Sequence, residues 1–353
     1  MTRDDVRRWG LVLAIVGGVA WGLGVLVDPH DAWVAYLVAL VSAMTIAVGA
    51  LSLVLMAHLS DATWFVLLRR IAQAVAASVP ILALLMIPAA FGLRALYPWL
   101  SPERLEPHVR ELVLRKRAYL NLTFFIVRSV VYVAAWTAIL VRLDRWSAQQ
   151  DAGARPAPLI GFSAAAAIVL GFTLTFASFD WLMSLRPDWS STVYGMRVYA
   201  GTAVAALGII AVVMPWSGLP YRPPHAHALA SLLLSFLIFW FYIAVSQLIV
   251  IWIGNTPAEI TWYLARSHGP WLLIAALLLV GHFVVPFLLL LFKPIKQSPR
   301  AMGRVGLWLL LMHYVDVCWL AVPDAGISAW SAVWIYPAAL VFVVSAAAIA
   351  SAW

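Results

Sequence analysis

The sequence predicts an all-α, polytopic membrane protein, and three observations lead to this fold class. Hydrophobic residues make up 64% of the 353 residues and charged residues only 11%, whereas soluble domains carry about 25% charged residues. Charge-free runs recur along the chain, each long enough for the about 20 helical residues that cross a bilayer core. Nearly all other residues form short connectors, so we expect one transmembrane domain over residues 1–353.

About ten spans follow one another along the chain. Eight contain long runs without Asp, Glu, Lys or Arg, and two are interrupted by a charge, Arg128 in the fourth span and Asp316 in the ninth. The first span follows three arginines and precedes no small-residue cleavage site, so we expect an uncleaved helix and not a signal peptide. The predicted spans are residues 9–27, 32–57, 71–93, 118–141, 158–179, 194–214, 228–253, 270–292, 304–322 and 331–352.

Two connectors are long enough to describe. Residues 94–117 contain three prolines and a charged stretch of helical character, which predicts a segment lying along the outer membrane surface. Residues 142–158 are polar and rich in Ala, Gly and Pro, which predicts a mobile cytoplasmic linker without chemistry.

The formal net charge of +8 is explained by membrane orientation. Connectors on the side of the N-terminus hold thirteen basic residues against eight on the opposite side, and short loops rich in Lys and Arg stay in the cytoplasm. We therefore expect a multi-pass protein with both termini in the cytoplasm, and no nucleic-acid partner. The thirteen are Arg3, Arg7, Arg8, Arg69, Arg70, Arg142, Arg145, Arg155, Arg222, Lys293, Lys296, Arg300 and Arg304.

The single cysteine, Cys318, lies inside the ninth span. One thiol excludes an internal disulfide, a four-cysteine iron–sulfur cluster and covalent attachment of haem c through a CxxCH motif. We therefore expect no cofactor bound by this chain alone, with any redox centres in partner subunits.

Ionisable side chains inside a bilayer are the first functional candidates, because each costs about 2.5–3.5 kcal/mol at a helix centre. His313 and Asp316 lie three residues apart, on one helix face, where they could share a proton. Alternatively, Asp316 neutralises Arg128 or another buried cation and only fixes helix packing. The candidates for a proton pathway are Arg128, Asp180, His313, Asp316, His58, Asp61 and Glu259.

Two histidines raise a second hypothesis. His282 and His313 lie at similar depths in adjacent antiparallel spans, where they could ligate a b-type haem. A membrane cytochrome b that transfers electrons across the bilayer would need a second ligand pair, which the sequence does not offer. No metal site other than this pair is predicted.

The loop between the fifth and sixth spans combines acids, an arginine and tryptophans. It holds Asp180, Trp181, Arg186, Asp188 and Trp189. These side chains could bind the head group of a quinone or contact another subunit. The alternative is ordinary membrane architecture, with the tryptophans as interfacial anchors and Asp188 as a helix cap.

A short internal sequence similarity favours a different class of protein. Asp61-Ala-Thr-Trp-Phe follows the second span and Glu259-Ile-Thr-Trp-Tyr follows the seventh. Repeats of inverted topology are common in secondary transporters, so a secondary transporter is the main alternative function.

Four stretches of the chain resemble a known family. FDWLMSLRPDWSSTVYGMRVYAG (179–201), KRAYLNLTFFIVR (116–128), SQLIVIWIGNTPAEITWYLARSHG (246–269) and YVDVCWL (314–320) are similar to NrfD-like, polysulfide-reductase-type membrane subunits of alternative complex III. That bacterial complex is a quinol:cytochrome c or copper-protein oxidoreductase, so the resemblance implies a multi-pass protein of the bacterial inner membrane.

The resemblance implies two four-helix bundles plus two peripheral helices, and no cofactor in the chain itself. It implies a sister NrfD-like subunit, multihaem cytochrome c subunits, an iron–sulfur subunit, lipids and a terminal oxidase as partners. In the sister subunit, a histidine follows the Pro-x-Trp element, and Ser190 stands there in this chain. Quinol oxidation is therefore expected elsewhere in the complex, with this subunit completing the membrane arm and serving in proton translocation or quinone binding.

Overall fold

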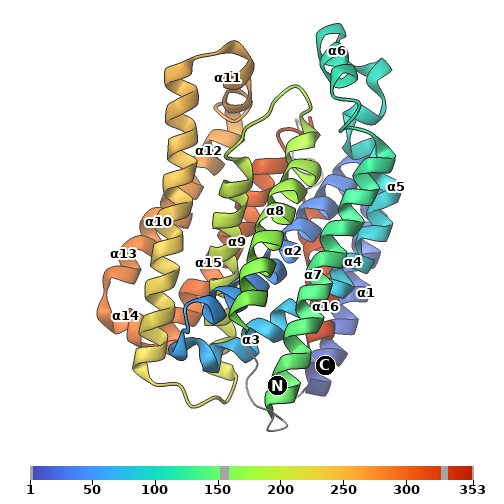
Figure 1. Cartoon of the computed structure of the whole chain (residues 1–353). Coiled ribbons are helices and arrows are strands. Elements are labelled where there is room, and N and C mark those ends of the chain that lie inside the picture. Colours follow the sequence, from blue (N-terminus) through green and yellow to red (C-terminus); the bar gives the residue numbers. More distant parts are fainter. Residues whose placement is uncertain (1–2, 152–158, 327–332, 352–353) are drawn as a thin grey trace.

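The computed structural model describes residues 3–151, 159–326 and 333–351, and over these ranges it contains helices and connectors without any strand. In this described part, nine helices are long and apolar enough to cross a membrane. The all-α polytopic fold predicted from composition is thereby confirmed (Figure 1).

Most spans are single helices, and two are built from consecutive shorter ones. The single helices are α1 (Arg3–Val27), α2 (Pro29–Leu59), α7 (Leu122–Asp151), α8 (Ile160–Trp181), α9 (Tyr194–Val213), α10 (Pro223–Gly254), α15 (Pro299–Ala321) and α16 (Ile335–Ser351). The third span comprises α3 (Val66–Ala76), α4 (Val79–Leu84) and α5 (Met86–Leu96), and the eighth comprises α12 (Gly269–Leu277), a π-helical turn (Leu278–Val284) and α13 (Val285–Leu291). The short helices between spans are α6 (Pro107–Arg115), α11 (Pro257–Leu264) and α14 (Lys293–Gln297).

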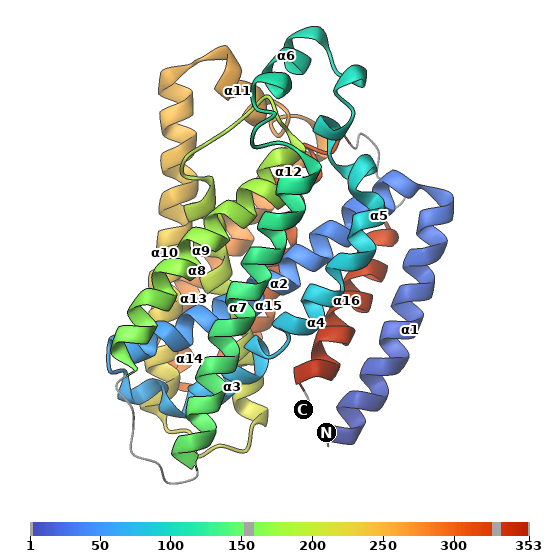
Figure 2. The ribbon, with the colours of Figure 1, turned by 45° about the vertical axis from the view of Figure 1, so that its right-hand side comes forward.

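The helices form two groups that meet at α2 and α9. One group contains α2, the third span, α7 and α8, and the other contains α9, α10, the eighth span and α15. Helices α1 and α16 pack against each other beside α2, at the edge of the molecule (Figure 2). Helix α2 is the most buried of the spans, because both groups and α16 cover it.

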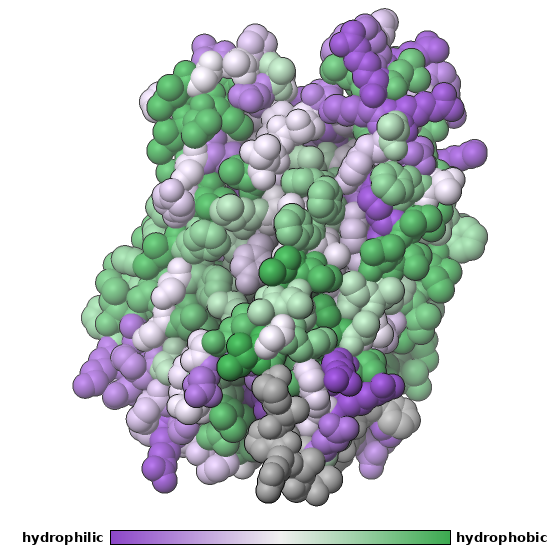
Figure 3. Space-filling model, in the orientation of Figure 1, coloured by the Kyte–Doolittle hydropathy of each residue, from purple (hydrophilic) through white to green (hydrophobic). Residues whose placement is uncertain are grey.

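The surface has the layering of a membrane protein. In Figure 3, hydrophobic residues occupy the middle of the visible face and hydrophilic residues gather at its two ends. Both chain ends lie at one end of the bundle, and α6 and α11 lie at the opposite end (Figure 1). We call these the terminal face and the α6 face.

Prolines explain the breaks in the third span, which was predicted over residues 71–93. A proline inside a helix clashes with the carbonyl four residues earlier. Helix α3 ends at Ala76, four residues before Pro80, and α4 ends at Leu84, four residues before Pro88. In the eighth span, Pro286 follows the π-helical turn that contains His282.

Two other helices differ from the expected spans. Helix α7 starts at Leu122 and runs to Asp151, ten residues beyond the predicted end of the fourth span, so the first part of the predicted linker is helical. A helix can continue into water, whereas hydropathy reports only its passage through lipid. Residues 152–158 of the predicted linker, and residues 331–332 and 352 of the predicted tenth span, lie outside the described residues; α16 covers residues 335–351.

Candidate functional site

Asp180, at the end of α8, is fully buried and holds two side chains of α7. Arg128 donates from Nε and Nη2 to the two carboxylate oxygens, each at 2.8 Å, and the Tyr132 hydroxyl donates to Oδ2 at 2.7 Å. The rings of Tyr119 and Phe124 lie 3.8 and 4.2 Å from the guanidinium. Bidentate bonding compensates both charges, as a buried ion pair requires. We call Asp180, Arg128 and Tyr132 the Asp180 cluster.

A second buried cluster joins α9, α10 and α15. Arg197 donates from Nη2 to Asp316 Oδ1 at 3.1 Å, and the Trp240 indole N–H donates to Asp316 Oδ2, also at 3.1 Å. The His282 ring stacks on Trp240, with ring centroids 4.1 Å apart. None of the four side chains is more than 4% exposed. Arg197, and not Arg128, is therefore the cation that Asp316 neutralises. We call these four residues the Asp316 cluster.

His313 connects this region to α2. Its Nε2 lies 2.9 Å from the Thr45 hydroxyl. Among the described residues, the side chains of His313 and Asp316 are not hydrogen-bonded to each other. Its Nδ1 and both ring nitrogens of His282 are buried without a hydrogen-bond partner in the described part of the chain. The spacing of His313 and Asp316 thus places them near one helix face without pairing them. The haem hypothesis for the two histidines stays a prediction.

A third ion pair closes the α6 face. Arg266, which is 2% exposed, donates to both Asp324 oxygens, at 3.0 and 2.7 Å. The same guanidinium donates to the backbone carbonyls of Trp262, Trp319 and Leu320. All three guanidinium nitrogens are bonded, so this arginine fastens the segment before α12 to the end of α15.

In the loop after α8, Asp180 and Arg186 do not pair with each other. Arg128 takes both oxygens of Asp180, so Arg186 faces other carboxylates. The Arg186 guanidinium lies 3.5 Å from Asp188 and 3.8 Å from Asp324. Arg186 and Asp188 therefore belong to the surface network of the α6 face.

The two loop tryptophans have separate roles. Trp181 donates its indole N–H to the Ser129 hydroxyl at 3.1 Å, inside the bundle. Trp189 stacks on Trp262 with centroids 4.8 Å apart and donates to the backbone carbonyl of Glu259 at 3.2 Å. Both rings are buried, so neither is an exposed interfacial anchor.

Lys116 fastens the long connector to the same loop. Its ammonium donates to the Pro187 carbonyl at 2.8 Å. Burial lowers the pKa of Lys116, and the nearby Asp188 carboxylate partly opposes that shift.

Three of the predicted pathway residues lie away from the clusters. His58 and Asp61 follow one another at the terminal-face end of α2, where His58 Nδ1 is 3.4 Å from the Ser163 hydroxyl and Asp61 is exposed. Glu259 is also exposed, on the α6 face, and accepts a hydrogen bond from Thr256 at 2.8 Å. The structure therefore brings together Arg128 with Asp180, and places His313 close to the Asp316 cluster, but leaves these three apart.

A small cavity lies among α2, α8 and α9. Its volume is about 10 Å³, which is the room of about one water molecule. Thr45, the partner of His313, lines it on one side, and Ser178 and Trp181, neighbours of Asp180, line it on another. The remaining lining is apolar, with Val41 and Leu174 among it. Val198, the chain neighbour of Arg197, also lines it. The cavity is thus a narrow, mostly apolar gap beside residues that adjoin both clusters.

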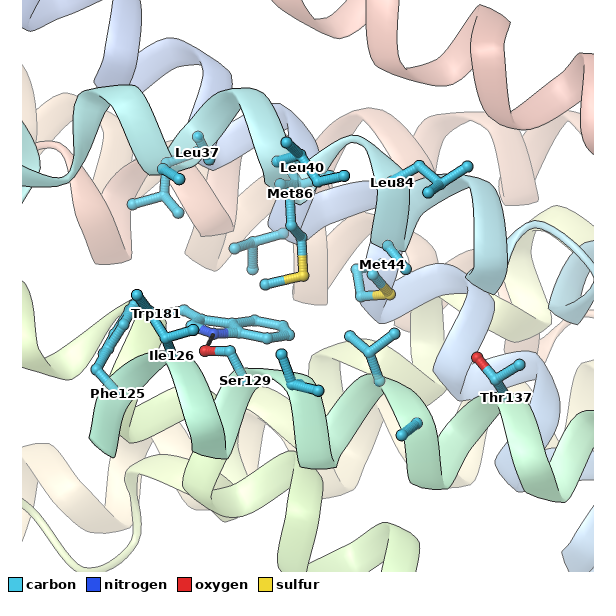
Figure 4. A pocket seen from close by; sticks show the side chains of 18 of the residues that line it. Leu37, Leu40, Met44, Leu84, Met86, Phe125, Ile126, Ser129, Thr137 and Trp181 are labelled. Carbon is cyan, nitrogen blue, oxygen red and sulfur yellow. Dashed lines mark hydrogen bonds between the residues drawn. The ribbon is translucent and has the colours of Figure 1, made fainter. Parts of the chain in front are cut away.

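A larger groove runs between α7 on one side and α2, α4 and α5 on the other (Figure 4). Its volume is about 930 Å³, at the upper end of the range for ligand pockets. The walls are apolar side chains such as Leu40, Met86 and Ile126. Trp181, bonded to Ser129, closes one end.

Sequence reasoning missed several of these residues. Arg197 stands at the first turn of an apolar run and was treated as its boundary, and Arg266 and Asp324 were treated as loop residues. Trp240 and Thr45 carry no charge and gave no signal in an apolar helix. A test for Arg at the ends of predicted spans would have found the two arginines, whereas their partners depend on the packing of distant helices.

Comparison with known proteins gives no matching family model, and no curated protein matches the chain.

Proposed function

We propose that this chain is an accessory, proton-conducting membrane subunit of a bacterial respiratory quinol oxidoreductase. The single observation that carries the proposal is the pair of buried ionisable clusters on adjacent helix groups, with a gap that has room for about one water molecule beside their neighbouring residues. Buried ionisable groups of this kind are rare in spans and mark ion and proton paths.

Protons would move between the clusters through the Thr45 hydroxyl, which lines the gap, and the His313 imidazole bonded to it. Thr45 and His313 form the contact on the α2 side, and His313 has a second nitrogen without a described partner. A neutral imidazole can accept a proton on one nitrogen and release it from the other. Because the gap is mostly apolar, it conducts only when water enters, which would make it a gate.

In this proposal, redox chemistry belongs to partner subunits. These are a sister membrane subunit, multihaem cytochrome c subunits and an iron–sulfur subunit, with a terminal oxidase as a further partner. Quinol is oxidised by the sister subunit, and this chain contributes the membrane arm. Arg186, partly exposed on the α6 face, lies where periplasmic partners would dock.

One observation favours a secondary transporter as second candidate. The third and eighth spans, which hold corresponding places in two five-span halves, are both interrupted at prolines. Interrupted spans in corresponding places often bind substrate in transporters. The positive φ angles of Asp61 and Asn255, at the ends of the second and seventh spans, add a second correspondence.

Purification separates the two candidates. The tagged chain is isolated from its native membrane in mild detergent, and its companions are identified by mass spectrometry and by the haem spectrum. Recovery with c-type haem and iron–sulfur subunits is the expected result. A colourless chain recovered alone would reject the respiratory function and favour the transporter.

Proton conduction is tested in vesicles reconstituted with the purified complex, by counting protons released per electron. Thr45→Val removes the hydroxyl at the gap with little change in shape, and Arg197→Gln with Asp316→Asn removes both charges together, so that no buried charge is left unpaired. Both are expected to lower the proton count while electron transfer continues. Thr173→Val, which removes a hydroxyl bonded to Trp136 outside the clusters, is the control. An unchanged proton count in both variants would remove the clusters from any pathway.

A further inference from the structure

The large groove has charged residues at one end only. The residues of α7 that line it include Phe125, Ser129, Val133 and Thr137, and the lining continues to Arg142 and Arg145. Twenty residues of helix separate Phe125 from Arg145, which corresponds to about 30 Å, the thickness of a bilayer core. The groove therefore follows α7 across the membrane and ends, toward the terminal face, at two arginines.

The interrupted third span explains why this groove exists. Helix α4 packs against α7, whereas α5, after the break before Pro88, packs mainly against α2. The space between α5 and α7 is therefore left without a helix. Leu84, Ile87 and Val130 line it and are each more than half exposed, so the groove is open to the surrounding lipid on one side.

The end away from the arginines offers few free hydrogen-bond donors. The Tyr97 hydroxyl donates to the Trp181 carbonyl at 3.1 Å, and the Trp181 indole N–H donates to Ser129. Both donors are thus already used inside the protein. A ligand whose polar head needed donors at this end would have to compete with these bonds.

The arginine end suits an anion. Arg142 and Arg145 are three residues apart, a spacing that places side chains on one helix face, and both are exposed. Both arginines line the groove, and the Arg142 guanidinium lies 4.5 Å from the centroid of the Trp146 ring. Asp144 lies two positions after Arg142 and one before Arg145, and residues at these spacings do not lie on the same face of a helix. Neither arginine has a carboxylate within ion-pair distance among the described residues.

From these four observations we infer that the groove holds one anionic phospholipid from the leaflet on the terminal face. Its phosphate is bound by Arg142 and Arg145. An acyl chain lies in the groove between α7 on one side and α2, α4 and α5 on the other (Figure 4). Arg suits phosphate through bidentate hydrogen bonds, and the apolar walls suit a hydrocarbon chain. This lipid site is independent of proton conduction and fills the space left by the interrupted span.

Lipid binding is measured on the purified full-length chain by native mass spectrometry, with titration of phosphatidylglycerol and, separately, phosphatidylcholine. One phosphatidylglycerol is expected to bind in preference to phosphatidylcholine. Arg142→Gln with Arg145→Gln is expected to weaken phosphatidylglycerol binding about 30-fold, the effect of two basic residues near an anionic lipid surface. Arg300→Gln with Arg304→Gln removes two exposed arginines from the terminal-face end of α15, outside the groove, and is the matched control.

A second measurement tests the acyl chain without relying on charge. A photoreactive benzoylphenylalanine in place of Ala138, which lines the groove, is expected to cross-link to lipid in native membranes. Equal binding of both lipids, equal loss in the two arginine double variants, or cross-linking of position 138 to a protein would each overturn the inference. Proton counts in the reconstituted complex do not enter either readout, so this inference and the proposed function fail separately.

Discussion

At the scale of single residues, buried charge is handled by pairing across helices. Arg128, Arg197 and Arg266 each meet an aspartate from another segment, and each guanidinium also lies against at least one aromatic ring. Removing one member of such a pair leaves an uncompensated buried charge, which costs about 3–5 kcal/mol. For this reason, functional tests of these pairs need the double neutral variants.

Lys116 gives a pH-dependent prediction at this scale. Because burial lowers its pKa, its amine loses the proton below the usual lysine range and reacts with acylating reagents at lower pH. Asp188 opposes the shift, so Asp188→Asn should lower the pKa further and move the labelling midpoint to still lower pH. The measurement is the extent of acylation of Lys116 against pH, by mass spectrometry of the purified chain.

Asp188→Glu keeps the negative charge and serves as the control for this labelling experiment. A midpoint that stays unchanged or rises in Asp188→Asn would show that the carboxylate does not act on Lys116.

At the scale of helices, prolines and glycines decide how closely the spans approach. The prolines interrupt the third span and thereby open the groove beside α7. Glycines act in the opposite way at the central contact of α2 with α9, where the absence of a Cβ lets the backbones meet. Small residues serve the same purpose in other membrane bundles.

Gly49→Ala should destabilise the protein at the α2–α9 contact. A Cβ at Gly49 would lie 2.6 Å from the backbone oxygen of Thr202, so the two helices would have to separate. Overpacking of this kind costs about 1–3 kcal/mol. The measurement is thermal unfolding of the purified chain in detergent, in which helicity is recorded against temperature.

Gly171→Ala is the matched substitution, since a Cβ there meets nothing within 4 Å. It should leave stability unchanged or raise it by about 0.5–1 kcal/mol through the better helix propensity of alanine. Equal unfolding temperatures for the two variants would contradict the close contact at Gly49.

At the scale of the whole molecule, the fold places its polar features asymmetrically. The three buried Arg–Asp pairs lie toward the α6 face. The arginine end of the groove lies toward the terminal face. The excess of basic residues in connectors of the terminal face predicts that this face is cytoplasmic.

Single-cysteine labelling tests the orientation. In a Cys318→Ala background, Glu103→Cys on the α6 face should react with a membrane-impermeant maleimide in intact cells. Gln149→Cys, near the end of α7 on the terminal face, should react only after the membrane is opened. Both positions are exposed, so access is set by the membrane. The reverse pattern would invert the predicted orientation, and labelling of both from outside would contradict the fold.

The sequence by itself determined the fold class, the order of the spans and most of the intramembrane charges. Hydropathy suffices for this because crossing a bilayer constrains every span in the same way, whatever its neighbours are. Arg128, Asp180, His313 and Asp316 could be chosen from the sequence, since charge inside an apolar run is visible without knowledge of contacts.

Only the tertiary structure decided the partners of these charges and the groove beside α7. The partner of Asp316 lies 119 positions away in the sequence, and that of Asp180 lies 52 positions away. For Asp316, the sequence offered His313, Arg128 or another buried cation, and for Asp180 it offered no specific partner. An ion pair forms where helix packing brings two charges together in a medium of low dielectric constant, and packing is a property of the bundle and not of any one span.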